Sequence, residues 1–194
     1  VTFRNYFNSE QDVEDIFTTI LGCEKAVIAP TMMGFFDWSA LHCSNAGTFG
    51  EAYRKLEPAA IWDMDKRTSW NTHYKAIYLT NFLHENQFRF KNISQERIDF
   101  WLAQADFVKA LMYFRLAQDW GEVVAPSTED ASQQAKSPIN TILTEAIQAA
   151  EAALILPTFD KLTNAQGNNI NSRQYASLGT VHTLLANIYA WMGG

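Results

Sequence analysis

The residues between 36 and 65 combine aromatic, carboxylate and amide side chains, the types from which a binding pocket for a small molecule is built. Such a pocket pairs an apolar, often aromatic platform with a few placed polar groups that orient the ligand. This part of the sequence shows no sustained helical or strand period, and loops carry function more often than scaffold helices do. An alternative is that the rings only pack this segment onto the fold, since large aromatic side chains are mostly buried. The candidate ligand-binding residues are Phe36, Asp37, Trp38, Asn45, Trp62 and Asp65.

Patterns typical of catalysis or metal binding are missing from the sequence. Asp63 and Asp65 are close in sequence, but no nucleophile and base accompany them, so solvated side chains explain this pair better than acid–base catalysis. None of the histidines has an i,i+4 histidine partner, the spacing used by helical metal sites. We therefore expect no catalytic residue, no metal site and no cofactor. The histidines are His42, His73, His84 and His182.

The composition indicates a folded protein with an acidic balance. Hydrophobic residues make up 47% of the chain and aromatic residues 13%, which excludes disorder as the default. The net charge is −6, from 21 acidic and 15 basic residues, and no basic stripe is visible. A nucleic-acid partner is therefore not expected, because phosphate binding needs clustered positive charge. The acidic residues are scattered, as on an ordinary solvated surface.

The cysteines and the lack of long apolar runs give information about the cellular compartment of the protein. Cys23 and Cys43 are either two free thiols or one disulfide, and their spacing does not distinguish these states. No run approaches the ~18 apolar residues of a membrane span, and no signal peptide is recognisable. The sequence fits a cytoplasmic protein or a mature or trimmed part of an exported one. Because an apolar helix runs directly into the final residues, we expect the chain to be part of a longer one.

Helical periodicity dominates from residue 68 onwards. Before it, we expect a short amphipathic helix that begins after the N-cap Ser9 and ends at Gly22, followed by turns and loops over residues 23–67. Ser94 and Ser137 are predicted N-caps of two later helices. The predicted long helices cover residues 68–86, 95–120, 138–156 and 172–192.

The helix over residues 95–120 is apolar on most of its circumference, whereas a helix that faces one core needs about three apolar positions in seven. We expect it to be sandwiched between neighbours, with only a narrow solvent-exposed stripe. Trp120 should close the end of the stack, and Gly121 should let the backbone turn away. The residues predicted for the exposed stripe are Asp99, Asp106 and Lys109.

The order of the helices predicts an all-α fold of tetratricopeptide-like antiparallel helix pairs, with an irregular, loop-rich segment near the N-terminus. Small residues in the last two helices allow close helix approach. Helix pairs of this kind bury their apolar faces by stacking on each other. A four-helix bundle is the competing architecture. Trp70, Tyr74 and Tyr78 lie at helical spacing and are predicted to belong to the core rather than to a ligand platform.

Four motifs follow each other along these helices, and their order carries more information than any one of them. The first two are Trp70, Tyr74, Ile77 and Asn81, and then Tyr113, Phe114, Leu116, Trp120, Gly121, Glu122 and Val123. The third runs through Lys136, Ser137, Pro138, Ile142, Ile147, Ala150, Leu156 and Pro157. The fourth comprises Ser172, Arg173, Ala176, Leu184, Leu185, Ala186, Ile188 and Tyr189.

In this order the motifs resemble those of the SusD/RagB family of outer-membrane nutrient-binding lipoproteins. The resemblance implies that residues 1–194 form a single N-terminal helical domain of a longer chain, with two helix pairs over residues 68–194. It also implies a cell-surface location in Bacteroidetes-type bacteria, through a lipid anchor that this chain does not contain. The implied partners are a SusC-like TonB-dependent transporter and an oligosaccharide or other nutrient.

The resemblance further implies binding without catalysis, and it assigns a purpose to the candidate residues between 36 and 65. Aromatic faces would stack on sugar rings, and carboxylates and amides would bind sugar hydroxyls. Two other classes stay open. One is a helical-repeat adaptor that binds peptides on a concave face. The other is an all-α enzyme, for which the sequence offers no constellation of catalytic residues.

Overall fold

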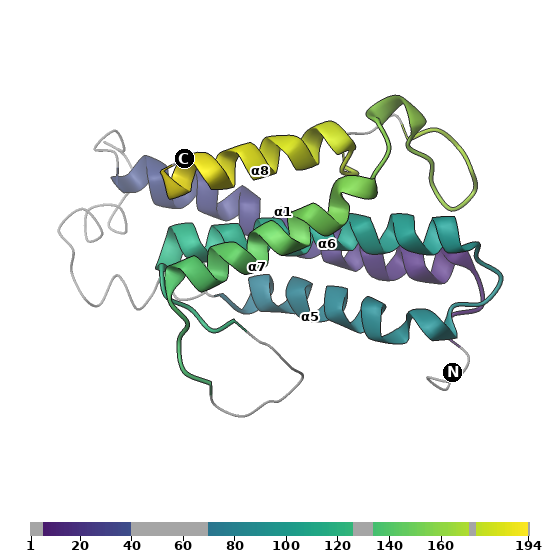
Figure 1. Cartoon of the computed structure of the whole chain (residues 1–194), viewed down its shortest axis with the longest axis horizontal. Helices are drawn as coiled ribbons and strands as arrows, with labels where there is room; N and C mark the ends of the chain where they lie inside the picture. Colours follow the sequence, from purple (N-terminus) through teal and green to yellow (C-terminus); the bar gives the residue numbers. More distant parts are fainter. Residues whose placement is uncertain (1–5, 40–69, 126–133, 171–173, 194) are drawn as a thin grey trace.

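The protein is all-α in the computed structural model, which describes residues 6–39, 70–125, 134–170 and 174–193, with the backbone alone over residues 29–39. Five α-helices and three short 3-10 turns account for the regular structure of these residues, and none of them belongs to a strand (Figure 1). The all-α prediction is therefore confirmed. The helices are α1 (Glu10–Ser39), α5 (Asn71–Asn86), α6 (Gln95–Trp120), α7 (Ile139–Ala152) and α8 (Leu178–Met192), and the 3-10 turns are η2 (Gln87–Arg89), η3 (Ala153–Ile155) and η4 (Phe159–Lys161).

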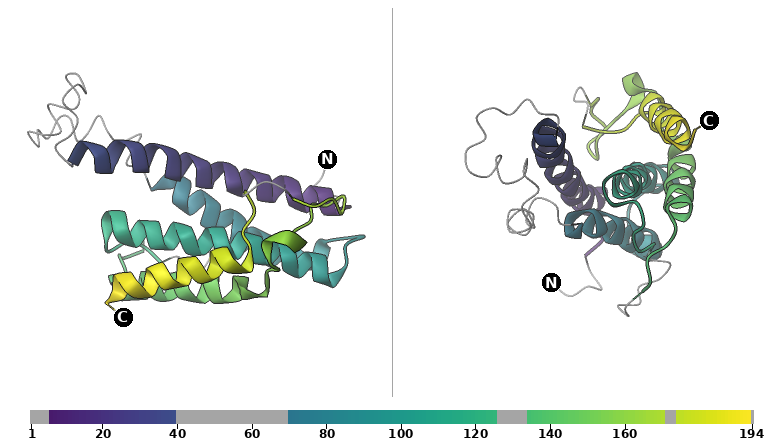
Figure 2. Two further views of the ribbon diagram at one scale, coloured as in Figure 1. Left: turned by 90° about the horizontal axis from the view of Figure 1, so that it is seen from above. Right: turned by 90° about the vertical axis from the view of Figure 1, so that its left-hand side faces the viewer.

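Helix α6 is the centre of the molecule. It packs against α1, α5, α7 and α8, and the end view in Figure 2 shows it enclosed by them. Trp101, Tyr113 and Leu116 are completely buried on its different sides. The expectation of a helix sandwiched between neighbours is therefore confirmed, and it explains why the sequence of α6 is apolar on most of its circumference.

Neighbouring helices in the chain run antiparallel, as expected for helix pairs. Helix α5 passes α6 in the opposite direction: His73, near the start of α5, contacts Trp120 at the end of α6, and His84, near the end of α5, contacts Asp106. Figure 1 shows the same reversal between α7 and α8. Helix α1 instead runs parallel to α6, because Glu10 and Arg97 meet at the N-terminal ends of these two helices.

Helix α1 is longer than predicted, and the expected end at Gly22 is wrong. The helix continues to Ser39, so residues 23–39 are helical rather than looped. The buried stripe of Val13, Phe17 and Ile20 is continued by Cys23 and Val27, which keeps the helix packed beyond the glycine. Gly22 itself lies on the exposed side, where it does not need to end the helix. Cys23 is a free, buried thiol, while Cys43 lies outside the described residues.

Side-chain caps fix the starts of three helices. The Asp12 carboxylate accepts the backbone N–H groups of Asn8 and Ser9 at the start of α1. The Ser94 hydroxyl accepts the Arg97 N–H at the start of α6, as predicted. Ser177 and Thr180 form a capping box at the start of α8. These bonds satisfy N–H groups that have no partner within the helix.

The predicted N-cap Ser137 is wrong. Helix α7 begins one residue later, with Pro138 at the N-cap position and no side-chain cap. The Ser137 N–H donates instead to the Val123 carbonyl at 2.7 Å, in an isolated bridge between the segments that flank residues 126–133. The Ser137 backbone is therefore paired with the segment that follows α6 rather than serving as the N-cap of α7.

Two of the three residues predicted for the solvent-exposed stripe of α6 face α5 instead, whereas Asp99 is half-buried and accepts a hydrogen bond from the Gln95 side chain of its own helix. Asp106 is only 6% exposed, and its Oδ1 lies 2.8 Å from Nε2 of His84 on α5. Lys109 donates to the Asn81 side chain at 2.8 Å. These groups enter a helix interface because each finds a partner there, which offsets the cost of removing it from water.

Gly121 ends α6 in the way that was expected. Its φ of +71° and ψ of −101° are open to glycine alone, and its N–H donates to the Ala117 carbonyl. Trp120 is half-buried against the core, and its ring lies 6.4 Å from that of Trp70 and 5.2 Å from that of His73. The tryptophan therefore covers the end of the α5–α6 pair without being fully enclosed.

The aromatic stripe on α5 differs from the prediction that it would be core. Tyr78 is 56% exposed and Trp70 is also exposed, whereas Tyr74 is half-buried and donates its hydroxyl to the Val124 carbonyl at 2.6 Å. The side of α5 that faces the core carries Ile77, Thr80 and Leu83. The helical periodicity was predicted correctly, but the side of α5 that is buried is adjacent to the aromatic stripe and does not coincide with it.

Among the described residues, no helix is both long enough and apolar enough to span a membrane.

Candidate functional site

A groove of about 440 Å³ runs along the outer side of α1 and forms the candidate site. Three turns of α1 form one wall, and the segment before α8 contributes a single residue from the other side. Its size lies within the range typical of small-ligand pockets. The lining residues are Thr18, Leu21, Gly22, Glu24, Lys25, Ile28 and Gln174.

The groove combines apolar and polar groups in one strip. Leu21 and Ile28 are half-buried and supply apolar surface. Gly22 leaves the space between them open, because a Cβ atom at this position would meet no neighbour within 4 Å. A carboxyl, an ammonium, a hydroxyl and an amide line the remainder, from Glu24, Lys25, Thr18 and Gln174. Such a surface suits a ligand with apolar C–H faces and many hydroxyl groups.

Glu24 is the electrostatically unusual residue of the groove. Partial burial removes water from its carboxyl group and raises the pKa from 4.5 to about 7. Near neutral pH the group is therefore present in both protonation states. A protonated carboxyl donates one hydrogen bond and accepts others, whereas the carboxylate only accepts. The group can thus match either role of a hydroxyl on a ligand.

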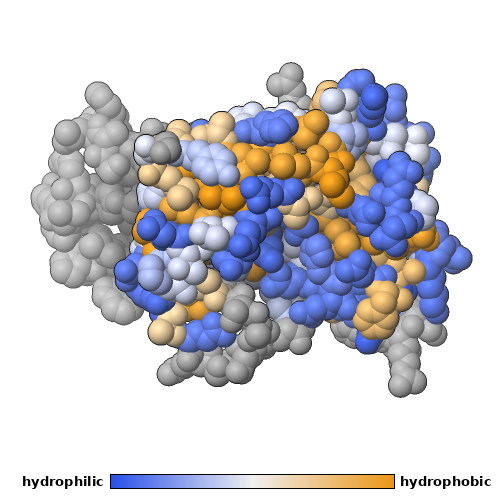
Figure 3. All heavy atoms as spheres, in the orientation of Figure 1, coloured by the Kyte–Doolittle hydropathy of each residue, from blue (hydrophilic) through white to orange (hydrophobic). Residues whose placement is uncertain are grey.

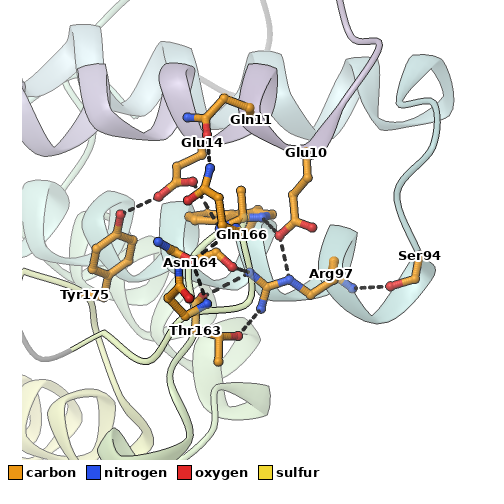
Figure 4. A network of polar contacts seen from close by, with 12 residues as sticks. Glu10, Gln11, Glu14, Ser94, Arg97, Thr163, Asn164, Gln166 and Tyr175 are labelled. Carbon is orange, nitrogen blue, oxygen red and sulfur yellow. Dashed lines mark hydrogen bonds and ion pairs between the residues drawn. The ribbon is translucent and has the colours of Figure 1, made fainter.

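The segment between α7 and α8, which supplies the groove residue Gln174, is held to α1 by a polar network around Arg97, shown in Figure 4. The Arg97 Nε donates to Glu10 Oε1 at 2.6 Å, and its terminal nitrogens donate to the Thr163 hydroxyl and to the carbonyls of Thr163 and Asn164. The planar guanidinium also lies 4.3 Å from the centre of the Phe100 ring. One side chain of α6 therefore links α1 to the segment between α7 and α8.

Glu14 provides a second link between α1 and this segment. Its two carboxylate oxygens accept hydrogen bonds from the Tyr175 hydroxyl at 2.8 Å and from the Ala165 N–H at 3.1 Å. Burial and the Glu14 carboxylate together raise the pKa of Tyr175, which stays a hydrogen-bond donor. Gln11 and Gln166 also pair through their side-chain amides. Gln174 in the groove is therefore adjacent to an anchored tyrosine.

Gln104 of α6 fixes the residue that follows Tyr175. Its completely buried side-chain amide donates to the Ala176 carbonyl at 2.7 Å and accepts the Ala176 N–H at 2.9 Å. Both backbone groups of Ala176 are thus satisfied away from water, as buried polar groups require. The start of α8 is consequently positioned by α6 rather than by the chain around it.

None of the candidate residues that the sequence indicated is among the described residues that line the groove. Phe36, Asp37 and Trp38 lie in the last turn of α1, where the backbone alone is described. Asn45, Trp62 and Asp65 lie outside the described residues. At 1.5 Å per residue, Phe36 is roughly 12 Å further along α1 than Ile28, the last groove residue. These candidates therefore stay predictions.

No sequence signal singled out the residues that line the groove. Glu24 and Lys25 read as ordinary surface charges, and Gln174 becomes their neighbour only because the segment before α8 folds back onto α1. Within the described part of the chain, no three His, Cys, Asp or Glu side chains are placed to hold a metal ion. His73 is buried with both ring nitrogens unpartnered, and burial followed by the nearby Arg115 lowers its pKa to about 4.

Comparison with known proteins gives a consistent result. A family model described as SusD-like, starch-binding and associating with the outer membrane matches residues 8–192. A SusD homolog from Bacteroides thetaiotaomicron superposes with a TM-score of 0.73 at 18% identity, covering 96% of this chain and 37% of its own. A second homolog from that organism gives 0.68 at 18% identity, covering 95% and 42%. A SusD superfamily protein from Bacteroides vulgatus gives 0.70 at 16% identity, covering 97% and 41%.

Identities this low establish a shared fold and no more. The chain spans 37–42% of the length of these three structures. No curated protein matches the sequence.

Proposed function

Because the chain belongs to the SusD-like family of starch-binding proteins that associate with the outer membrane, we propose that it is a non-catalytic glycan-binding protein of the cell surface. The observation that carries this proposal is the family match over residues 8–192. This range includes all described helices, from Glu10 at the start of α1 to Met192 at the end of α8. In the proposed role the protein binds an oligosaccharide and passes it to a SusC-like TonB-dependent transporter. A lipid anchor outside residues 1–194 would hold it at the membrane.

We place a glycan contact in the groove beside α1. A sugar ring has apolar C–H faces and a rim of hydroxyl groups, and the groove has an apolar strip from Leu21 and Ile28 with polar groups along it. Glu24 would bind hydroxyls as donor or acceptor, and Lys25 would donate to ring or hydroxyl oxygens. Among the described residues that line the groove none is aromatic, so these residues contribute hydrogen bonds rather than stacking.

The residues predicted from the sequence would supply the stacking. Phe36, Asp37 and Trp38 follow the groove on the same helix, and Asn45, Trp62 and Asp65 come shortly afterwards in the chain. An aromatic platform is the usual complement to hydroxyl-binding groups in sugar recognition. We therefore propose that one glycan chain contacts both parts of the surface.

Variants of the full-length protein test the groove. Calorimetric titration with starch-derived oligosaccharides should show weaker binding for Glu24→Ala and Lys25→Ala. Loss of a hydrogen bond to a charged group corresponds to ~1.5–3 kcal/mol, or roughly a tenfold or larger rise in Kd. Glu151→Ala, at an exposed position of α7 away from the groove, is the matched control and should bind normally. Unchanged affinity in both groove variants would move the glycan site elsewhere.

The transporter partner needs a separate experiment. The full-length protein, purified from its own membranes under mild conditions, should bring a TonB-dependent outer-membrane transporter with it. Recovery of a soluble peptide-binding complex instead, with no response to any glycan, would favour the helical-repeat adaptor.

A further inference from the structure

The segment between α7 and α8 is held to the rest of the protein by specific bonds more than by apolar packing. None of residues 163–170 is fully buried, and the surface over this segment is largely hydrophilic on the side drawn in Figure 3. A segment that buries little apolar surface gains little from the hydrophobic effect. Its position, and that of the groove residue Gln174 which follows it, is therefore set by hydrogen bonds to α1 and α6.

One of these bonds reaches α1 close to the groove. Figure 4 shows Tyr175 pointing at α1, where its hydroxyl donates to Glu14 Oε1 at 2.8 Å. Glu14 and the groove residue Thr18 are four residues apart, so they lie one above the other on the same side of α1. The bond between Tyr175 and Glu14 therefore fixes the approach of the segment to α1 one helical turn from the groove.

The environment of Glu14 makes this bond a strong one. Glu14 is only 7% exposed, and its other carboxylate oxygen accepts the Ala165 N–H at 3.1 Å. A buried carboxylate needs such partners, because it has lost the water that would otherwise solvate it. Hydrogen bonds from a hydroxyl to a carboxylate are also stronger than those between neutral groups.

The ring and the hydroxyl of Tyr175 contribute in different ways. The ring packs on Phe17 and on Trp101, with ring centres 5.7 and 6.0 Å apart. Such apolar packing is non-directional, whereas a hydrogen bond weakens when its atoms move out of line. The hydroxyl is therefore the part of this side chain that fixes the orientation of the segment, and phenylalanine at this position would keep the packing alone.

Gln174 is placed by the anchored residues that come directly after it. Tyr175 is bonded to α1, and both backbone groups of Ala176 are paired with the Gln104 side chain of α6. Gln174 itself is exposed, and its amide can both donate and accept hydrogen bonds. A polar group whose backbone is already fixed loses less freedom when a ligand binds, which raises the affinity.

We propose that Tyr175 is a positioning residue of the groove, which holds the Gln174 amide across from α1 so that one glycan contacts both walls. Tyr175 does not touch the ligand in this role. Its bond to Glu14 sets the spacing between the walls, and Gln174 makes the hydrogen bond to a sugar hydroxyl. This role rests on the proposed function, since it concerns affinity for a glycan in the groove.

Removal of the Tyr175 hydroxyl alone tests this role. Calorimetric titration of full-length Tyr175→Phe with starch-derived oligosaccharides should show a rise in Kd of roughly fivefold, the equivalent of one neutral hydrogen bond. Tyr74→Phe is the matched control and should bind normally. It removes a hydroxyl bond of 2.6 Å to the Val124 carbonyl, and neither residue is among the described groove lining. An equal loss of affinity in both variants would reveal an effect of general stability and overturn the proposal.

A double variant shows whether Tyr175 acts through Gln174. Gln174→Ala should weaken binding by itself, because it removes the amide that contacts the sugar. Adding Tyr175→Phe to Gln174→Ala should then weaken binding no further, since there is no longer an amide to position. Losses that add in the double variant would contradict the positioning role, because Tyr175 would then affect the ligand by another route.

The variants of Glu24 and Lys25 separate this role from the site itself. Normal binding by Tyr175→Phe, while Glu24→Ala and Lys25→Ala lose affinity, would refute positioning by Tyr175 and leave the groove as the glycan site. Unchanged affinity in all three variants would instead refute the glycan site, and the role of Tyr175 with it.

Discussion

Glu24 lines the groove, and its raised pKa also makes the stability of the fold depend on pH. Its pKa is raised from 4.5 to about 7 because burial disfavours the carboxylate. The folded state therefore holds this proton more tightly than the unfolded chain does. The corresponding stability is present below pH 4.5 and is lost as the pH rises towards 7.

We expect Glu24→Gln to remove this loss. Urea denaturation at a series of pH values should show that the variant gains stability relative to the wild type between pH 4.5 and 7. Glu151→Gln, on the exposed side of α7, should follow the wild-type profile. Parallel profiles for Glu24→Gln and the wild type would mean that the carboxyl is better hydrated than the structure shows.

His73 has the opposite effect on the pH profile. Burial, and then Arg115, lower its pKa from 6.5 to about 4, so the folded state favours the neutral ring. The unfolded chain binds more protons between these values, and stability is lost as the pH falls from 6.5 towards 4. Each pKa unit corresponds to about 1.4 kcal/mol, so the loss is on the order of 3 kcal/mol.

Replacing His73 with Phe should reduce this acid sensitivity. Both ring nitrogens lack a partner, so no hydrogen bond is lost, and the new ring can still pack on Trp120. Thermal unfolding at pH 4.5 and 7.0 should show a smaller difference for His73→Phe than for the wild type. His182→Gln, at an exposed position of α8, should show the wild-type difference.

At the scale of single residues, the predictions from the sequence were wrong where the burial of a residue depends on a partner far away in the chain. Asp106 read as solvent-exposed because charged residues usually are, yet it is buried against His84, which precedes it by 22 residues on another helix. Glu24 likewise read as an ordinary surface charge. The pattern of apolar and polar residues along one helix does not show where the neighbouring helix packs against it.

At the scale of single elements, two glycines of similar appearance have opposite roles. Gly121 has a φ of +71° and ends α6, whereas Gly22 lies within α1. A Cβ atom would meet no neighbour within 4 Å at either position. Only backbone conformation therefore distinguishes them.

The two alanine variants should change stability in opposite directions. Gly121→Ala should cost ~1–3 kcal/mol because an L side chain is strained in this backbone region. Gly22→Ala should stabilise by ~0.5–1 kcal/mol because alanine favours a helix interior. Urea denaturation measures both. A loss of stability in Gly22→Ala would contradict the continuous α1, since alanine would then oppose a real helix end.

Arg97 tests how the segment between α7 and α8 is held to α1. Arg97→Lys keeps the charge but loses the fork that reaches Glu10, Thr163 and Asn164 together. We expect a loss of ~1.5–3 kcal/mol in unfolding free energy, together with faster hydrogen exchange around residues 163–170. Arg89→Lys, where the guanidinium lies over the exposed Phe88 ring, is the control and should change neither quantity.

At the scale of the whole molecule, the order of the motifs along the chain was more informative about family and fold than any single motif or helix-end signal. Four motifs between Trp70 and Tyr189 indicate the family and the helix pairs from the amino-acid sequence alone. The length of α1 was missed because Gly22 is a common end signal, and the buried stripe that overrides it depends on packing against α5 and α6. The groove was missed because its walls come from residues about 150 positions apart in the sequence.

The most direct test of the account is calorimetric titration of the full-length protein with starch-derived oligosaccharides, followed by chromatography of the sugar. A non-catalytic glycan-binding protein should show saturable binding, and the oligosaccharide should be recovered at its original length. Absence of binding across a broad panel of glycans would contradict it, and so would shortening of the oligosaccharide during the titration.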